Sequence, residues 1–162
     1  MAPRKYTPEI LAKAFLIAAR ARDEMLAIHF TDNGGAIHSA ERIINLLGLA
    51  LNHAKLSHIN KLKLDGNAEW SEDAYAARAK ISDIQIEHVS PLRALTVAAI
   101  THIEHKPEAQ KAEFLQKFVK EHFRLALLTR EQTAKLNKHN RSKMTLDRLA
   151  EAGLKMRPRN SG

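Results

Sequence analysis

No cysteine occurs among the 162 residues, which excludes disulfide bonds and zinc sites built from thiolates. Aromatic residues make up only 5%, so the core must be built mainly from Leu, Ile, Ala and Val. The longest apolar runs, such as residues 43–50, are well short of a membrane span. Charges return early, at Lys13 and Arg20, so that no signal-peptide core develops. We therefore expect a cytoplasmic protein without a membrane partner.

Several catalytic motifs are also absent. The one pair of adjacent glycines is Gly34 and Gly35, and neither GxGxxG nor GxxxxGK[ST] occurs, so no phosphate-cradling glycine loop is predicted. There is no GxSxG nucleophile elbow, and cysteine nucleophiles are excluded with cysteine itself. The sequence gives no support to these classes of nucleotide-binding protein and hydrolase.

The formal net charge of +8 arises entirely in the last third of the chain. Residues 1–105 carry 12 Lys and Arg against 12 Asp and Glu, whereas residues 106–162 carry 14 against 6. A neutral scaffold followed by a basic segment indicates a surface that faces a polyanion, most plausibly nucleic acid. The alternative is a solvated basic tail with no partner.

Hydrophobic spacing predicts a predominantly helical α+β fold with two strands. Thr7 before Pro8 is a good helix N-cap, and Thr129 followed by Gln132 is another. Ile84 and Ile86 alternate with polar residues as a strand does. The expected helices cover residues 8–30, 39–62, 91–105, 108–122 and 130–138, with short ones near 71–79 and 147–152, and the second strand covers 123–128.

We expect a single domain over residues 1–162. It comprises a helical support region (1–80), a strand and helix unit (81–140) and a basic C-terminal segment (141–162), whose last residues from Lys155 are expected to be mobile. The N-terminal helices should brace the strand and helix unit. They are also candidates for a homodimer interface, because amphipathicity alone does not distinguish a core face from an interface.

An acidic residue and a histidine are adjacent where the first strand should end, and Pro91 follows. Neighbouring side chains of a strand point to opposite sides, so Glu87 and His88 can serve two different roles. A carboxylate can ligate a metal ion, and a neutral imidazole can accept a proton from water. The alternative is that the pair is a surface accident.

Residues 84–140 resemble the HNH nucleases, the ββα-metal group that cuts nucleic acid backbones. The resemblance lies in Glu87-His88-Val89-Ser90-Pro91, like the family's acidic-His-x-x-Pro signature, and in the strand and helix that lead to Leu136-Asn137. It implies N-terminal helices packed on a C-terminal ββα-metal unit, with a helical insertion between the two strands. It also implies roles for single residues.

By this resemblance His88 is the general base, Glu87 a metal ligand and Asn137 a second ligand on the helix. Thr133 falls where some family members hold a second histidine. The expected cofactor is one divalent metal, Mg²⁺ or Mn²⁺, because these ions prefer oxygen ligands.

The sequence thus predicts a metal-dependent endonuclease, a phosphodiester hydrolase that acts on DNA rather than RNA. Phosphate contacts are expected from the basic side chains Arg93, Lys135, Lys138, Arg141 and Lys143, and further along from Arg157 and Arg159. One alternative is a non-catalytic, basic, helical nucleic-acid-binding protein. Another is a protein-interaction module whose basic tail is incidental.

Overall fold

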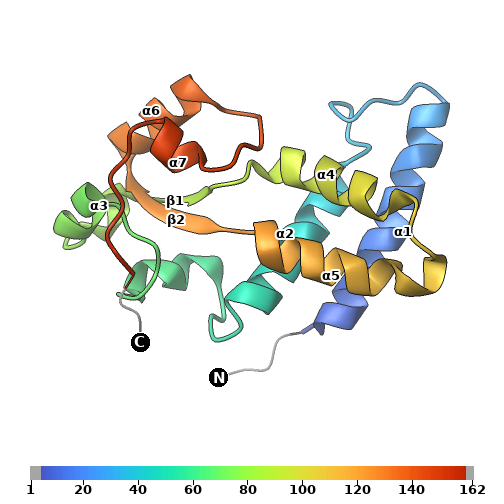
Figure 1. Cartoon of the computed structure of the whole chain (residues 1–162), viewed down its shortest axis with the longest axis horizontal. Helices are drawn as coiled ribbons and strands as arrows, with labels where there is room; N and C mark the ends of the chain where they lie inside the picture. Colours follow the sequence, from blue (N-terminus) through green and yellow to red (C-terminus); the bar gives the residue numbers. More distant parts are fainter. Residues whose placement is uncertain (1–4, 160–162) are drawn as a thin grey trace. The chain divides into compact units, whose positions relative to one another are not determined.

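The computed structural model describes residues 5–159 and has the mainly helical α+β architecture that the sequence predicts (Figure 1). Within that range, a two-stranded antiparallel sheet joins β1 (Ile84–His88) to β2 (Leu125–Thr129). The chain divides into two compact units, Met1–Lys55 with Leu92–Phe123, and Leu56–Pro91 with Arg124–Gly162. Folding as one domain stays a prediction. No helix in the described part of the chain has the length and apolar character needed to cross a membrane.

The first unit is built from helices that bury their apolar faces against one another. Its elements are α1 (Pro8–Ala27), α2 (His38–Asn52), α4 (Leu92–Glu104), η3 (Glu108–Gln110) and α5 (Lys111–His122). Thr7 caps α1 as predicted, since its hydroxyl accepts from the Ile10 N–H at 3.3 Å. In this unit α1 and α2 pack with α4 and α5, the helices of the insertion between the strands. The sequence did not predict this partnership.

Helices α2 and α5 approach closely near their C-terminal ends. The Asn52 side-chain amide donates to the carbonyl oxygens of Lys120 at 3.1 Å and Phe123 at 2.8 Å, which satisfies acceptors at the end of α5. One turn before Asn52, Gly48 faces the buried Phe123 ring. A Cβ atom added to Gly48 would lie 2.2 Å from ring carbons of Phe123. The missing side chain at residue 48 is therefore what lets the ring pack there.

We expect Gly48→Ala to destabilise the protein by about 1–3 kcal/mol, because the buried ring must shift to admit a methyl group. This strain opposes the higher helix propensity of alanine, which alone would stabilise the variant by about 1 kcal/mol. Gly66→Ala is the control, since a Cβ there meets no atom within 4 Å. Urea unfolding monitored by circular dichroism measures both. Equal stability of Gly48→Ala and the wild type would contradict the packing described.

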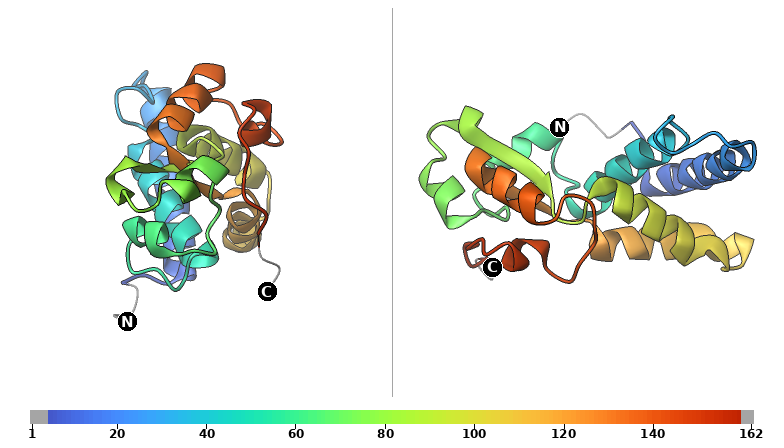
Figure 2. Two further views of the ribbon diagram at one scale, coloured as in Figure 1. Left: turned by 90° about the vertical axis from the view of Figure 1, so that its left-hand side faces the viewer. Right: turned by 90° about the horizontal axis from the view of Figure 1, so that it is seen from above.

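The second unit contains the sheet. Its elements are η1 (Ile59–Leu64), α3 (Glu72–Ala76), η2 (Ile81–Asp83), β1, β2, α6 (Arg130–His139) and α7 (Arg148–Glu151). The helix predicted over residues 39–62 is too long, because α2 ends at Asn52 and the chain enters the second unit after Lys55. There the fully buried Leu62 anchors η1 instead. Figure 2 shows α6 lying along the sheet.

The free edge of β2 is lined by two further extended segments. The Leu127 N–H donates to the Glu69 carbonyl at 2.8 Å, and the Ser71 N–H donates to the Leu127 carbonyl at 3.0 Å. The C-terminal segment lies beside the segment around Trp70, because the Arg157 N–H donates to the Trp70 carbonyl at 2.8 Å. The expectation of a mobile tail from residue 155 is therefore wrong for residues 155–157, which backbone hydrogen bonds hold in place. Residues 160–162 of that tail lie outside the described part.

Candidate active site at the end of strand β1

The pairing of β1 with β2 fixes the position of the acidic residue and the histidine. Glu87 lies opposite Ala126 in the antiparallel register. His88, the last residue of β1, lies opposite Leu125, the first residue of β2. Both side chains are half-buried. The two predicted strands therefore pair, and the motif lies at the end of the sheet.

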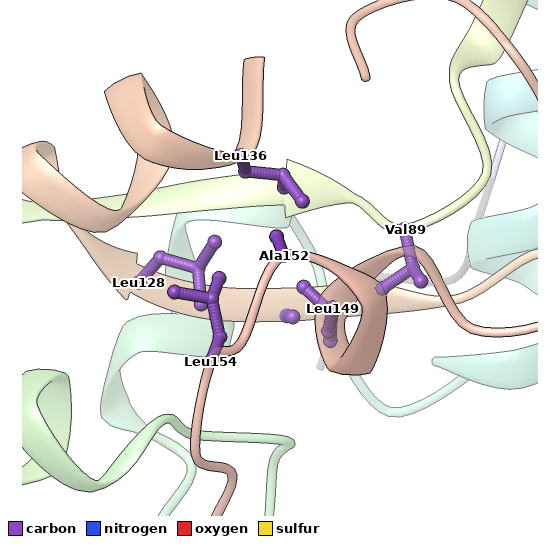
Figure 3. Close-up of a cluster of buried hydrophobic side chains, with 7 residues drawn as sticks. Val89, Leu128, Leu136, Leu149, Ala152 and Leu154 are labelled. Carbon is purple, nitrogen blue, oxygen red and sulfur yellow. The ribbon is translucent and has the colours of Figure 1, made fainter. Parts of the chain in front are cut away.

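The two side chains project from opposite faces of the sheet. One face packs against α6 and α7 through a cluster of buried apolar side chains (Figure 3): Val89, Ala126, Leu128, Leu136, Leu149, Ala152 and Leu154. Because side chains alternate along a strand, Glu87 shares the face of Val89, and His88 projects to the other. Glu87 therefore lies on the side that carries α6 and α7.

Helix α6 begins directly where β2 ends. The Gln132 N–H donates to Thr129 Oγ1 at 3.2 Å, and the Thr129 N–H donates to Gln132 Oε1 at 3.1 Å, which closes a capping box. The Gln132 side chain also donates to Asp73 Oδ2 at 3.1 Å and accepts from the Ser71 hydroxyl at 2.5 Å. The start of α6 is thus held to the sheet and to the start of α3.

Arg148 is the residue that joins the parts of this site. It is only 2% exposed, and its guanidinium donates three hydrogen bonds. The acceptors are the Asn140 carbonyl at 2.6 Å, the His88 carbonyl at 3.0 Å and Asn137 Oδ1 at 2.9 Å. One buried cation therefore forms hydrogen bonds with the end of β1, the inner face of α6 and the loop after α6.

Arg148 was not among the predicted site residues, although the sequence carries a signal for it. Asp147 caps α7, because its carboxylate accepts from the Ala150 N–H at 3.2 Å, and Arg148 is therefore the first residue of a helix. A cation is disfavoured at a helix N-terminus by the helix dipole. An arginine that directly follows such an aspartate and precedes Leu149 therefore needs acceptors elsewhere in the fold. Such a residue is a candidate for a buried polar network.

Burial and the charge of Arg148 set the electrostatics of the site. Burial raises the pKa of Glu87, and the positive charge of Arg148 opposes this in part. Burial likewise lowers the pKa of Arg148, against the effect of Glu87. Burial lowers the pKa of His88 below its ordinary value of about 6.5. His88 is therefore neutral at pH 7, the state in which an imidazole can accept a proton.

The side-chain oxygens on α6 that suit a hard divalent cation are few. Thr133 Oγ1 is buried without a hydrogen-bond partner among the described residues, and Thr133 lies one turn before Asn137 on the same face of α6. The Asn137 oxygen has two lone pairs, so the bond from Arg148 leaves one for another partner. Within residues 5–159 no three His, Cys, Asp or Glu side chains are grouped as metal ligands. A metal at this site would have to take its ligands from Glu87, the Asn137 amide oxygen, the Thr133 hydroxyl and water.

Three of the predicted phosphate contacts lie on α6 and in the loop that follows it. Lys138 is exposed on α6 beside Asn137, and the exposed Arg141 and Lys143 follow in the next loop. The Asn140 side chain shapes that loop, since its Oδ1 accepts from the Lys143 N–H at 2.9 Å and its amide donates to the Lys143 carbonyl at 2.8 Å. Three of the predicted basic residues therefore follow Asn137 closely along the chain.

Two other predicted contacts, Lys135 and Arg93, have different surroundings within their own units. Lys135 projects from α6 about 200° around the helix from Asn137, into a cavity of about 340 Å³ lined also by Glu72, Asp73 and Glu131. Arg93 belongs to the helical unit. There its guanidinium donates to Glu41 at 2.7 Å and to Asn33 at 2.8 Å. For both residues the phosphate contact stays a prediction.

The basic residues at the C-terminal end are engaged within the second unit. The Arg157 guanidinium lies 3.3 Å from the centre of the Tyr75 ring. Arg159 donates to Glu69 Oε2 at 2.6 Å, and Arg124 also forms an ion pair with this carboxylate. Burial of Glu69 alone would raise its pKa, but hydrogen bonds and charges from Arg124 and Arg159 outweigh burial and lower it.

This cluster predicts an acid-sensitive contribution to stability. Because the folded state lowers the pKa of Glu69, its stabilisation is present above the ordinary Glu pKa of about 4.3 and is lost as pH falls through the lower folded value. Glu69→Gln should cost about 1–3 kcal/mol at pH 7 and flatten the loss of stability toward acid. Urea unfolding at pH 7 and at about pH 3 measures this, with exposed Glu151→Gln as the control. A steeper acid loss in Glu69→Gln would contradict it.

No protein-family model, curated protein or solved structure matches this chain. The site is therefore described by its geometry alone. Glu87 and the neutral His88 lie at the end of the antiparallel pair of β1 and β2. Helix α6, which follows β2, carries the amide oxygen of Asn137 and the hydroxyl oxygen of Thr133.

Proposed function

We propose that the chain is a metal-dependent endonuclease that hydrolyses phosphodiester bonds of DNA. The observation that carries the proposal is the pairing of β1 with β2, which leads directly into α6. This arrangement puts Glu87 on the face that carries α6, where Asn137 is held by Arg148. The strand, strand and helix order is the one that the resemblance to HNH nucleases requires.

In this proposal His88 is the general base. Its neutral imidazole accepts the proton of the attacking water while the new bond to phosphorus forms and the bond to the leaving oxygen breaks. Glu87, Asn137 and Thr133 would hold the metal, which when bound stabilises the charge that develops on the phosphate and the leaving oxygen. Arg148 is a positioning residue, because it holds the His88 carbonyl and the Asn137 amide.

Lys138, Arg141 and Lys143 supply phosphate contacts in this proposal. They are exposed and stand within six positions of Asn137 in the chain. The second unit carries 14 Lys and Arg against 9 Asp and Glu, which favours a polyanion. Binding to DNA should therefore weaken steeply as the salt concentration rises.

One observation favours a second candidate, a non-catalytic nucleic-acid-binding protein. The Arg148 guanidinium already donates to Asn137 Oδ1, the oxygen that a metal would use, and its charge acts on Glu87. In that case Glu87 and Asn137 would serve to orient a buried arginine, and the exposed basic side chains alone would bind phosphate.

One experiment separates the two candidates. A labelled DNA duplex is incubated with the protein in EDTA, Mg²⁺ or Mn²⁺, and binding and cleavage are read from native and denaturing gels of the same samples. Cleavage with metal and binding without cleavage in EDTA support the nuclease. Binding in all samples with no cleavage supports the second candidate, and no binding at low salt excludes both.

A further inference from the structure

The outer face of α1 carries an apolar stripe that the helical unit leaves exposed. Its large side chains Ile10 and Ile17 are 52% and 61% exposed, and Ile28, the C-cap residue directly after α1, is 76% exposed. Ala14 and Ala21 lie between them and are half-buried. Together with Glu24, a charged residue at the edge of the stripe, these positions alternate in spacing between four and three residues, the spacing of a seam along which two helices pair.

The spacing of the stripe reads the same from both ends and is centred on residue 19. If two α1 helices lie antiparallel about that centre, Ile10 faces Ile28 of the partner subunit. Ile17 then faces Ala21 of the partner subunit. A large side chain meets a small one on either side of the centre, which lets the helices pack closely without voids.

The charges beside the stripe fit the same arrangement. Lys13 and Glu24 are exposed, and within residues 5–159 neither has an ion-pair partner. They are 11 residues apart, about three helical turns, so both project from the same flank of α1. In the antiparallel pair the two-fold axis places the same flank of both α1 helices side by side. Each Lys13 therefore lies beside Glu24 of the partner subunit. A parallel pair would keep these charges apart.

We propose that α1 is a self-association surface, which pairs antiparallel with α1 of a second copy of this chain. The contact is isologous, with Ile17 packed on Ala21 of the partner subunit and two reciprocal ion pairs between Lys13 and Glu24. The proposal does not depend on the proposed nuclease function, since every residue in it belongs to the helical unit.

Sedimentation velocity over a range of protein concentrations tests the proposal on the full chain. The wild type should sediment as a reversible dimer. Lys13→Glu and Glu24→Lys should each weaken the dimer by about tenfold, because each change turns two attractive contacts into two repulsive ones. The double variant should regain wild-type affinity. Ile17→Lys should give a monomer, with Ile81→Lys in the second unit as the matched exposed control.

Circular dichroism and thermal melting are used to check the folding of each variant. We expect all of them to be folded, because the changed side chains are exposed. A monomeric wild type would overturn the proposal. A dimer that survives Ile17→Lys would also overturn it, as would a double charge reversal that stays as weak as the single ones.

Discussion

His88→Gln is expected to reduce DNA cleavage by about 10²–10⁴-fold, the usual contribution of a general base. Burial keeps the imidazole neutral at pH 7. Glutamine is similar in size, so the end of β1 should remain packed. Initial rates of plasmid cleavage in Mn²⁺ measure the effect, and DNA binding in EDTA should stay unchanged.

The matched control is His139→Gln, which changes an exposed histidine at the end of α6. It should cleave at close to the wild-type rate. The wild-type rate should fall with acid only below pH 6.5, since the pKa of His88 is lowered. Equal rates for His88→Gln and the wild type would contradict the role of His88.

The second large effect is expected on stability. Arg148→Ala should lower the free energy of unfolding by about 3–5 kcal/mol, because it removes a buried cation from three acceptors and leaves the half-buried Glu87 without its charge partner. The loss of stability should be confined to the second unit, because the end of β1, α6 and the loop after α6 all accept hydrogen bonds from the Arg148 guanidinium there.

Arg141→Ala is the control for Arg148→Ala, because Arg141 is an exposed arginine of the neighbouring loop. It should change stability by about 0.5 kcal/mol or less. Urea unfolding of the three proteins gives the comparison. An Arg148→Ala variant as stable as Arg141→Ala would show that the buried network does not stabilise the second unit.

The parts of the site that depend on neighbours in sequence could be predicted from the sequence. Thr129 and Gln132 form their capping box within one turn. The alternation of Ile84 and Ile86 indicates a strand without any knowledge of the strand with which it pairs. For the same reason Thr7 marked the start of α1 correctly.

Features that join distant residues could not be predicted. Arg148 lies 60 residues from the His88 carbonyl to which it donates, and Asn52 lies 71 residues from Phe123. A periodic pattern shows that a helix has an apolar face but not which other helix that face contacts. The packing of α1 and α2 with α4 and α5 was therefore not predicted. The pairing of the segment around Arg157 with Trp70 was missed for the same reason.

The central claim is metal-dependent hydrolysis at the Glu87–His88 end of β1, and a Mn²⁺ titration of the cleavage rate tests it most directly. Wild-type protein is treated with EDTA, dialysed, and assayed on supercoiled plasmid as Mn²⁺ is added. We predict no cleavage without metal and a rate that rises to saturation, with Glu87→Gln requiring much more Mn²⁺. Plasmid that stays intact at every Mn²⁺ concentration, or is cut equally in EDTA, would contradict the claim.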